Sequence, residues 1–169
     1  MFKIGEIIIY GLSGVYEVTD VREETVLGKR ADYYVLHSPT DKDAALLFVP
    51  VDNEVLTSQM RYPMTKDEAK ALIASMDSIE PAAWIKDQRR RTEEYKRLIS
   101  TAEPRMLISV IKAIRSNAEI RRTEGKKSYV ADENVCQRAE NLLLSELTIS
   151  LGKSADAIVC LLHKAFNNT

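Results

Sequence analysis

The only tryptophan of this 169-residue chain, Trp84, stands directly before a basic cluster. Lys86, Arg89 and Arg90 belong to that cluster, and residues 86–97 hold six basic side chains against three acidic ones. An exposed indole can lean on a minor-groove base step while neighbouring cations hold phosphates. Most lone tryptophans, however, are largely buried, and arginines often form a solvated helix face. The pattern therefore leaves two roles open for Trp84, a DNA contact and a core anchor.

Residues that could carry catalysis or bind a metal are scattered along the sequence. Cys136 and Cys160 lie in separate apolar segments, with no second Cys or His at ligand spacing from either. His37 and His163 are equally isolated, and neither a Gly-x-Ser-x-Gly motif nor a phosphate loop accompanies them. We therefore expect two structural thiols, no metal, no cofactor and no small-molecule substrate, in a protein that is not an enzyme.

Charge is distributed unevenly along the chain, although the formal net charge is only -1. Residues 1–60 carry 5 basic and 10 acidic side chains, while residues 61–169 carry 19 basic and 15 acidic ones. An acidic front and a basic back suggest two modules. With the strand and helix patterns described below, this change predicts one domain at residues 1–62 and a second at residues 63–169.

No apolar run approaches the roughly 18 residues that a membrane helix needs. The first residues, Met1 to Glu6, also lack the features of a secretion signal. We therefore expect a cytoplasmic protein that makes no membrane contact.

The front half has the composition of short β-strands. Runs of β-branched and aromatic residues alternate with segments rich in Gly, Ser and Asp, which favour turns. Closely spaced short strands favour a small barrel, and about 60 residues are enough for a marginal one. The runs are Ile7 to Tyr10, Val15 to Thr19, Tyr33 to Leu36, and Leu46 to Val49.

The back half has the periodicity of helices. Thr65 and Glu68 have the form of a capping box, and Pro104 stands where a helix can begin without losing a hydrogen bond. Four apolar stripes at helical spacing predict a compact all-α domain. The fold class is therefore α+β, with a β domain followed by a helical one. The stripes are Ala69, Leu72, Ile73 and Met76; Leu107, Val110, Ile111 and Ile114; Val135, Ala139, Leu142, Leu143 and Leu147; and Ala155, Ile158, Val159, Leu162 and Phe166.

The order of these motifs resembles the CarD and CdnL transcription regulators of bacteria. Their pattern opens with Phe-x-x-Gly-Asp, a strand ending in Tyr, and a Gly-containing turn before the next strand. Here these elements correspond to Phe2 to Glu6, Ile7 to Tyr10, and Gly14 to Val18. The segment Pro81 to Trp84 matches the family's tryptophan, and Arg138 to Leu147 resembles its penultimate helix. The resemblance covers essentially the whole chain.

The resemblance implies a Tudor-like barrel that docks on the β subunit of RNA polymerase, followed by a helical domain that contacts promoter DNA. It implies that Trp84 wedges into the minor groove at the upstream edge of the melted region and stabilises the open complex. Lys86 and Arg89 would hold the neighbouring backbone, with Arg90 in the same DNA-binding set. Because this mechanism needs no sequence-reading helix, we expect action at many promoters.

The polymerase-facing strand of the family maps to residues 46–50, with Phe48 and Pro50 at contact positions and Leu46 beside them. Some relatives carry an arginine where Phe48 stands. They carry another in the strand connection that corresponds to residues 20–25, a segment in which Arg22 is the only basic residue here. The docking surface predicted from the resemblance is therefore more apolar and less ionic than in those relatives.

A second interpretation is a polymerase-binding adaptor that does not contact DNA, since the polymerase-binding module of transcription-repair coupling factors is similar to this barrel. The exposure of Trp84 discriminates between the two. A buried indole favours the adaptor, whereas an exposed indole beside Lys86 and Arg89 favours the DNA wedge.

Overall fold

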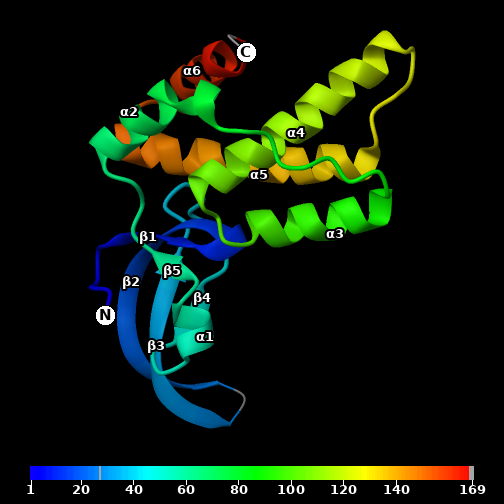
Figure 1. Ribbon diagram of the computed structural model, residues 1–169. Coiled ribbons are helices and arrows are strands. Elements are labelled where there is room, and N and C mark those ends of the chain that lie inside the picture. The colour runs from blue at the N-terminus through cyan, green and yellow to red at the C-terminus, as the bar shows by residue number, and fades with distance from the viewer. Residues whose placement is uncertain (27, 168–169) are drawn as a thin grey trace. The chain divides into compact units, whose positions relative to one another are not determined.

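The computed structural model describes residues 1–26 and 28–167 of the chain. Two compact units are present, Met1–Pro63 and Met64–Thr169. The first consists mainly of strands and the second of helices, which confirms the α+β class (Figure 1). Among the described residues, none of the helices is both long and apolar enough to cross a bilayer.

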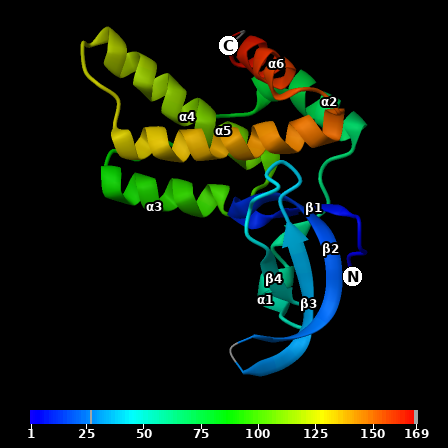
Figure 2. The same cartoon turned by 180° about the vertical axis from the view of Figure 1, so that it is seen from behind.

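The first unit is built on a five-stranded antiparallel sheet with the order β4-β3-β2-β1-β5. Its two long strands, β2 and β3, form a curved hairpin (Figures 1 and 2). A β-bulge between Val18 and Asp20 shifts the register of this pair, and bulges of this kind bend a strand. The elements are β1 Ile7–Tyr10, β2 Gly14–Val26, β3 Lys29–His37, β4 Leu47–Pro50, α1 Glu54–Thr57 and β5 Met60–Arg61.

The predicted closed barrel is not formed by strand pairing in the described part of the chain. Strands β4 and β5 stand at the two opposite edges of the sheet, with four and two residues respectively. Closing a barrel requires the edge strands to pair with each other in a staggered register. These two strands are short and are joined through α1, so the sheet stays open, and the Tudor-like form is supported only as an antiparallel sheet.

One face of the sheet carries a buried apolar cluster. Side chains alternate between the two faces of a strand, so Tyr34 and Leu36 of β3 join this cluster, while Tyr33 and Val35 are also buried on the opposite face. The buried cluster consists of Ile8, Val18, Tyr34, Leu36, Val49 and Met60.

The second unit is helical, and two of its helices, α2 and α4, begin where the sequence predicts. Thr65 and Glu68 form the complete capping box of α2, and Pro104 stands in the first turn of α4. Gly152 ends α5 in the left-handed conformation, with φ 60°, which glycine adopts without strain. The elements are α2 Lys66–Ala74, the 3₁₀ turn η2 Met76–Ser78, α3 Gln88–Ile99, α4 Pro104–Thr123, α5 Val130–Leu151 and α6 Ala155–Asn167.

The predicted apolar stripes form most of the helical core. Helices α3, α4 and α5 pack against one another, and α2 and α6 pack beside α5 (Figures 1 and 2). In the last stripe, Ile158 and Leu162 are buried, but Ala155 is exposed and Val159 is 37% exposed. Assigning these two residues to the core was wrong, because α6 packs through one face and leaves the other in solvent.

Candidate functional site

Trp84 lies in a segment without helix or strand, residues 79–87, which connects η2 to α3. We call this segment the Trp84 arm. Because such a segment makes no regular backbone ladder, its carbonyl groups need other hydrogen-bond partners. Side chains of α3 and α4 supply several of them.

The approach to the arm is fixed by Lys112 of α4, whose side chain is buried. Its ammonium group donates hydrogen bonds to the carbonyl oxygens of Met76 at 2.7 Å, Asp77 at 3.2 Å and Ile79 at 3.0 Å. These three bonds use all three donors of the ammonium group. The buried cation is thus satisfied, and the chain leaving η2 is tied to the middle of α4.

The middle of the arm is held by one polar residue of α4 and one of α3. The Ser109 hydroxyl donates to the Glu80 carbonyl at 2.8 Å, and the Ala82 amide donates to the Ser109 carbonyl at 3.0 Å. The hydroxyl of buried Tyr95 donates to the Ala83 carbonyl at 3.1 Å. Burial raises the pKa of Tyr95 above its ordinary value of 10.0, so this donor keeps its proton at neutral pH.

The backbone after Trp84 is held by Arg91, on the buried side of α3. One terminal nitrogen, Nη1, donates to the carbonyl oxygens of Ile85 at 2.6 Å and Lys86 at 3.3 Å. The other terminal nitrogen, Nη2, lies 2.7 Å from Oδ2 of Asp132 in the first turn of α5. Nε also donates to both oxygens of that carboxylate, at 3.2 and 3.1 Å.

The indole of Trp84 is half-buried. The guanidinium carbon of Arg91 lies 4.1 Å from the ring centroid, over the ring, and the Tyr95 ring approaches edge-on at 6.5 Å. The ring is therefore neither a fully buried core anchor nor a freely exposed side chain. It is a partly accessible aromatic surface on an anchored segment.

The predicted cations around Trp84 differ in how far their charge is compensated. Arg89 is exposed and forms an ion pair with Glu93 at 3.3 Å, one turn along α3. Lys86 and Arg90 are also exposed, and neither has an ion-pair partner among the described residues. The charge available to an anionic ligand therefore comes first from Lys86 and Arg90.

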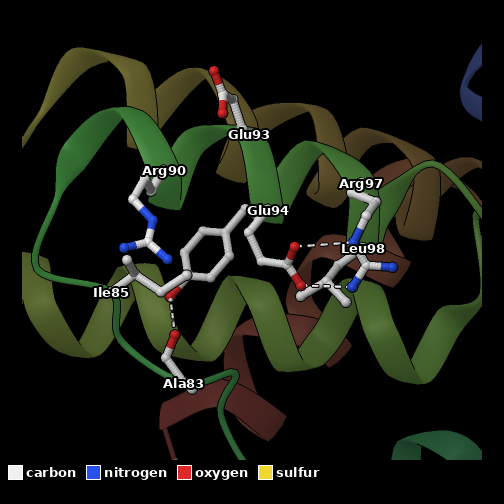
Figure 3. A pocket seen from close by; sticks show the side chains of 8 residues that line it. Ala83, Ile85, Arg90, Glu93, Glu94, Arg97 and Leu98 are labelled. Atoms are coloured by element: carbon white, nitrogen blue, oxygen red, sulfur yellow. Dashed lines mark hydrogen bonds and ion pairs between the residues drawn. The ribbon is translucent and has the colours of Figure 1, made fainter.

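A hollow of about 500 Å³ opens between the arm and α3. In Figure 3, Arg90 lies at one end of the hollow, and the Glu94–Arg97 ion pair closes the other. Arg97 donates to both carboxylate oxygens of Glu94, at 2.9 and 2.6 Å, and this hydrogen bonding lowers the pKa of Glu94. The residues that line the hollow are Ala83, Ile85, Arg90, Glu93, Glu94, Tyr95, Arg97 and Leu98.

In the first unit, three predicted docking residues share one face of the sheet. Pro50 of β4 pairs with Tyr33 of β3, and Tyr33 pairs with Arg22 of β2. Pro50 and Arg22 therefore lie in one row across the strands, with Tyr33 between them. Phe48 lies two residues before Pro50 and contacts the Tyr33 ring edge-on at 6.4 Å. Because Val49 between them belongs to the core, Phe48 and Pro50 point away from it.

The charge of Arg22 is compensated within its own strand, since ion pairs join it to Asp20 at 3.3 Å and Glu24 at 2.8 Å. Leu46 precedes β4 and is 48% exposed, and Phe48 is half-buried. This face thus presents apolar groups beside an arginine whose charge is compensated.

Sequence reasoning missed the residues that hold the arm: Ser109, Lys112, Tyr95, Arg91 and Asp132. A usable signal exists for the two charged residues of the ion pair. Arg91 stands one turn before the buried Tyr95, and Asp132 stands one turn before the buried Cys136, so each falls on an apolar stripe.

The described residues contain no group of three or more His, Cys, Asp or Glu side chains that could hold a metal ion. Both cysteines are free. Cys136 is buried, and burial, assisted by the nearby Glu140, raises the pKa of its thiol to about 12. Cys160 is exposed, so the expectation of two structural thiols was wrong for this residue, which lies on the outer face of α6.

Comparison with known proteins identifies the first unit. The family model of the CarD-like/TRCF RID domain matches residues 2–61, which include the whole sheet and all four predicted docking residues. No curated protein matches the chain. Residues 2–61 therefore form a CarD-like/TRCF RID domain, which is an RNA polymerase-interacting domain.

Proposed function

We propose that the protein is a transcription regulator that docks on the β subunit of RNA polymerase and stabilises the open complex at promoters. The docking part of this proposal rests on the family match over residues 2–61. The DNA-contact part is supported by Trp84, which is half-buried on an anchored arm beside two cations that have no ion-pair partner within the described part of the chain. The proposal includes no catalytic step and no cofactor.

Docking on polymerase is assigned to strand β4 and to the sheet face that carries Phe48, Pro50 and Arg22. Strand β4 is at the edge of the sheet, and an edge strand can accept a further strand from a partner through its backbone groups. Phe48, Pro50 and Leu46 would add apolar contacts at that edge. With Arg22 neutralised by its own neighbours, a mainly apolar contact is expected, and its strength depends on the fit of Phe48.

The DNA contact is assigned to Trp84, Lys86 and Arg90, with a smaller part for Arg89. A ligand shifts promoter melting only if it binds the melted state more tightly than the closed duplex. An aromatic wedge does so at a junction that is already distorted, because part of the unstacking cost has been met there. The cations position the wedge on the phosphates without reading sequence.

Docking and DNA contact are expected to depend on each other. With a net charge of -1, the protein releases few counterions on binding DNA, so its affinity for free DNA should be weak. Attachment to polymerase raises the effective concentration of the arm at the promoter, as linked binding events do.

The alternative is a polymerase-binding adaptor without a DNA contact. The contacts of Trp84 with Arg91 and Tyr95 favour it, since they partly cover the indole. In this role Trp84 would mainly stabilise the helical unit.

The Trp84→Ala variant separates the two functions. If Trp84 is a wedge, polymerase binding and the melting temperature stay near wild type, while open complexes decay faster. Trp84→Phe, which keeps a smaller aromatic ring, should restore part of the lifetime. Unchanged decay would instead favour the adaptor, and a stability loss of about 3 to 5 kcal/mol would identify a core anchor.

A further inference from the structure

The ion pair between Arg91 and Asp132 is buried to an unusual degree for charged residues. Their side chains are 1% and 4% exposed. Removing a guanidinium and a carboxylate from water is costly, and apolar residues of similar volume often give equal or greater stability. The pair therefore calls for an explanation other than stability alone.

The guanidinium of Arg91 joins three parts of the second unit. Nε and Nη2 bind the Asp132 carboxylate from α5, Nη1 binds the carbonyls of Ile85 and Lys86, and the planar group covers the Trp84 ring. A planar fork with donors in several directions can do this, whereas the ammonium group of a lysine cannot. Asp132 orients the fork, and the fork fixes both the ring and the backbone beside it.

Asp132 lies in the first turn of α5, where the partial positive charge of the helix terminus attracts a carboxylate. The ring of Tyr129, the residue before α5, lies 5.0 Å from the guanidinium carbon of Arg91. Arg91 is thus held between a carboxylate and two aromatic rings.

We propose that Arg91, clamped by Asp132, is a positioning residue that holds the Trp84 indole in a preset orientation for its partner. The inference rests on the proposed function of Trp84 as a DNA contact. A mobile indole would lose rotamer freedom on insertion, and this loss would weaken binding to the melted promoter. An indole that is already ordered avoids that loss, so the clamp would increase the lifetime of the open complex without touching DNA.

Because Trp84 is the only tryptophan, its fluorescence reports the arm directly. Removing one member of a buried pair is strongly destabilising, so the test uses the double variant Arg91→Met with Asp132→Leu, which leaves no buried charge. The control is Glu94→Gln, which changes the carboxylate of an exposed ion pair on α3. Full-length variants are compared by thermal melting, time-resolved fluorescence anisotropy and acrylamide quenching.

In the double variant we expect cooperative melting at a lower temperature, because the Ile85 and Lys86 carbonyls lose their donor. We also expect a smaller amplitude of the slow component of the Trp84 anisotropy decay, and stronger quenching. Glu94→Gln should leave both signals unchanged. A folded double variant with wild-type anisotropy and quenching would overturn the proposal, because the indole would then be ordered without the clamp.

Open-complex lifetimes on the same variants separate this inference from the proposed function. The double variant should shorten the lifetime toward that of Trp84→Ala, and adding Trp84→Ala to it should give little further loss, because coupled residues are not additive. If Trp84→Ala shortens the lifetime but the loosened double variant does not, the positioning role is refuted. If the indole loosens but neither variant changes the lifetime, the positioning is supported and the DNA contact fails.

Discussion

The Trp84 arm and strand β4 carry the two candidate contact surfaces, and they are held in place by different kinds of bonds. In β4, Phe48 and Pro50 stand on a backbone ladder with β3, in register with Val35 and Tyr33. In the arm, backbone carbonyls are bound by side chains that are distant in sequence, such as Lys112, which is 33 residues from Ile79.

This difference predicts different responses to mutation. A strand ladder uses backbone groups, so side chains on β4 can change while the strand keeps its place. The arm depends on individual side chains, and each loss leaves a carbonyl without its partner. Variants of the arm supports should therefore affect stability first, and variants of β4 should affect partner binding first.

The largest effect is expected for Lys112→Ala. It removes three hydrogen bonds to carbonyls and leaves a cavity, so the free energy of unfolding should fall by about 2 to 5 kcal/mol. Denaturant unfolding of the full chain measures this loss. Lys70→Ala, at a mostly exposed lysine of α2, is the control and should change stability by less than about 0.5 kcal/mol. Equal curves for the two variants would mean that the arm does not depend on Lys112.

Phe48→Ala tests the other half of the comparison. Binding to the polymerase β subunit should weaken by roughly 1 to 4 kcal/mol if Phe48 is a hot spot, with little loss of thermal stability. Ile4→Ala removes another exposed apolar side chain of the first unit and should bind normally. A loss of stability that matches the loss of binding would show that Phe48 belongs to the core.

A related test asks whether the first unit binds polymerase by itself. A fragment of residues 1–62 should retain most of the affinity of the full chain for the β subunit. The helical fragment, residues 63–169, should retain little. Polymerase binding by the helical fragment alone would refute both the predicted division of labour and the docking role of β4.

Tyr95→Phe should have a smaller effect on the arm. It removes the hydrogen bond to the Ala83 carbonyl, and a loss of about 0.5 to 1.5 kcal/mol is expected. Because burial raises the pKa of Tyr95 in the folded state, its contribution is complete below the ordinary value of 10.0 and is lost as the pH rises through the folded value. Unfolding curves measured up to and beyond pH 10 should therefore be less pH-dependent in Tyr95→Phe than in wild type.

The smallest effect concerns salt. If the arm makes two or three phosphate contacts, the slope of log affinity for free DNA against log salt should be about -2 to -3. Arg90→Gln should make this slope less steep by about 1. Arg89→Gln should change it less, because Glu93 already compensates that charge. Equal changes would mean that the Arg89–Glu93 pair opens on DNA.

The sequence predicts the parts of the fold that depend on local rules. The capping box at Thr65 and the start at Pro104 follow from neighbouring residues alone, and the stripes around Leu107 and Leu143 follow from periodicity. Barrel closure depends on pairing between distant edges, which no local pattern records. The open sheet is therefore where the fold prediction was wrong.

The candidate site is predicted in its surface residues and missed in its supports. Trp84 and its cations form a contiguous pattern, whereas Arg91 was counted with the other arginines of a basic run. Its partner, Asp132, is 41 residues away, and one sequence does not show such a pairing. A charged residue on an apolar stripe is the physical signal that would have found both.

The two thiols give this protein a built-in difference in chemical reactivity. At pH 8 the Cys136 thiol, with a pKa of about 12, is almost entirely protonated, while Cys160 is open to solvent. Maleimide dyes should therefore label the unmodified sequence at Cys160 alone. A dye there that accepts energy from tryptophan would report movements of the Trp84 arm relative to α6, so the proposed DNA contact of the arm can be tested without engineering a cysteine.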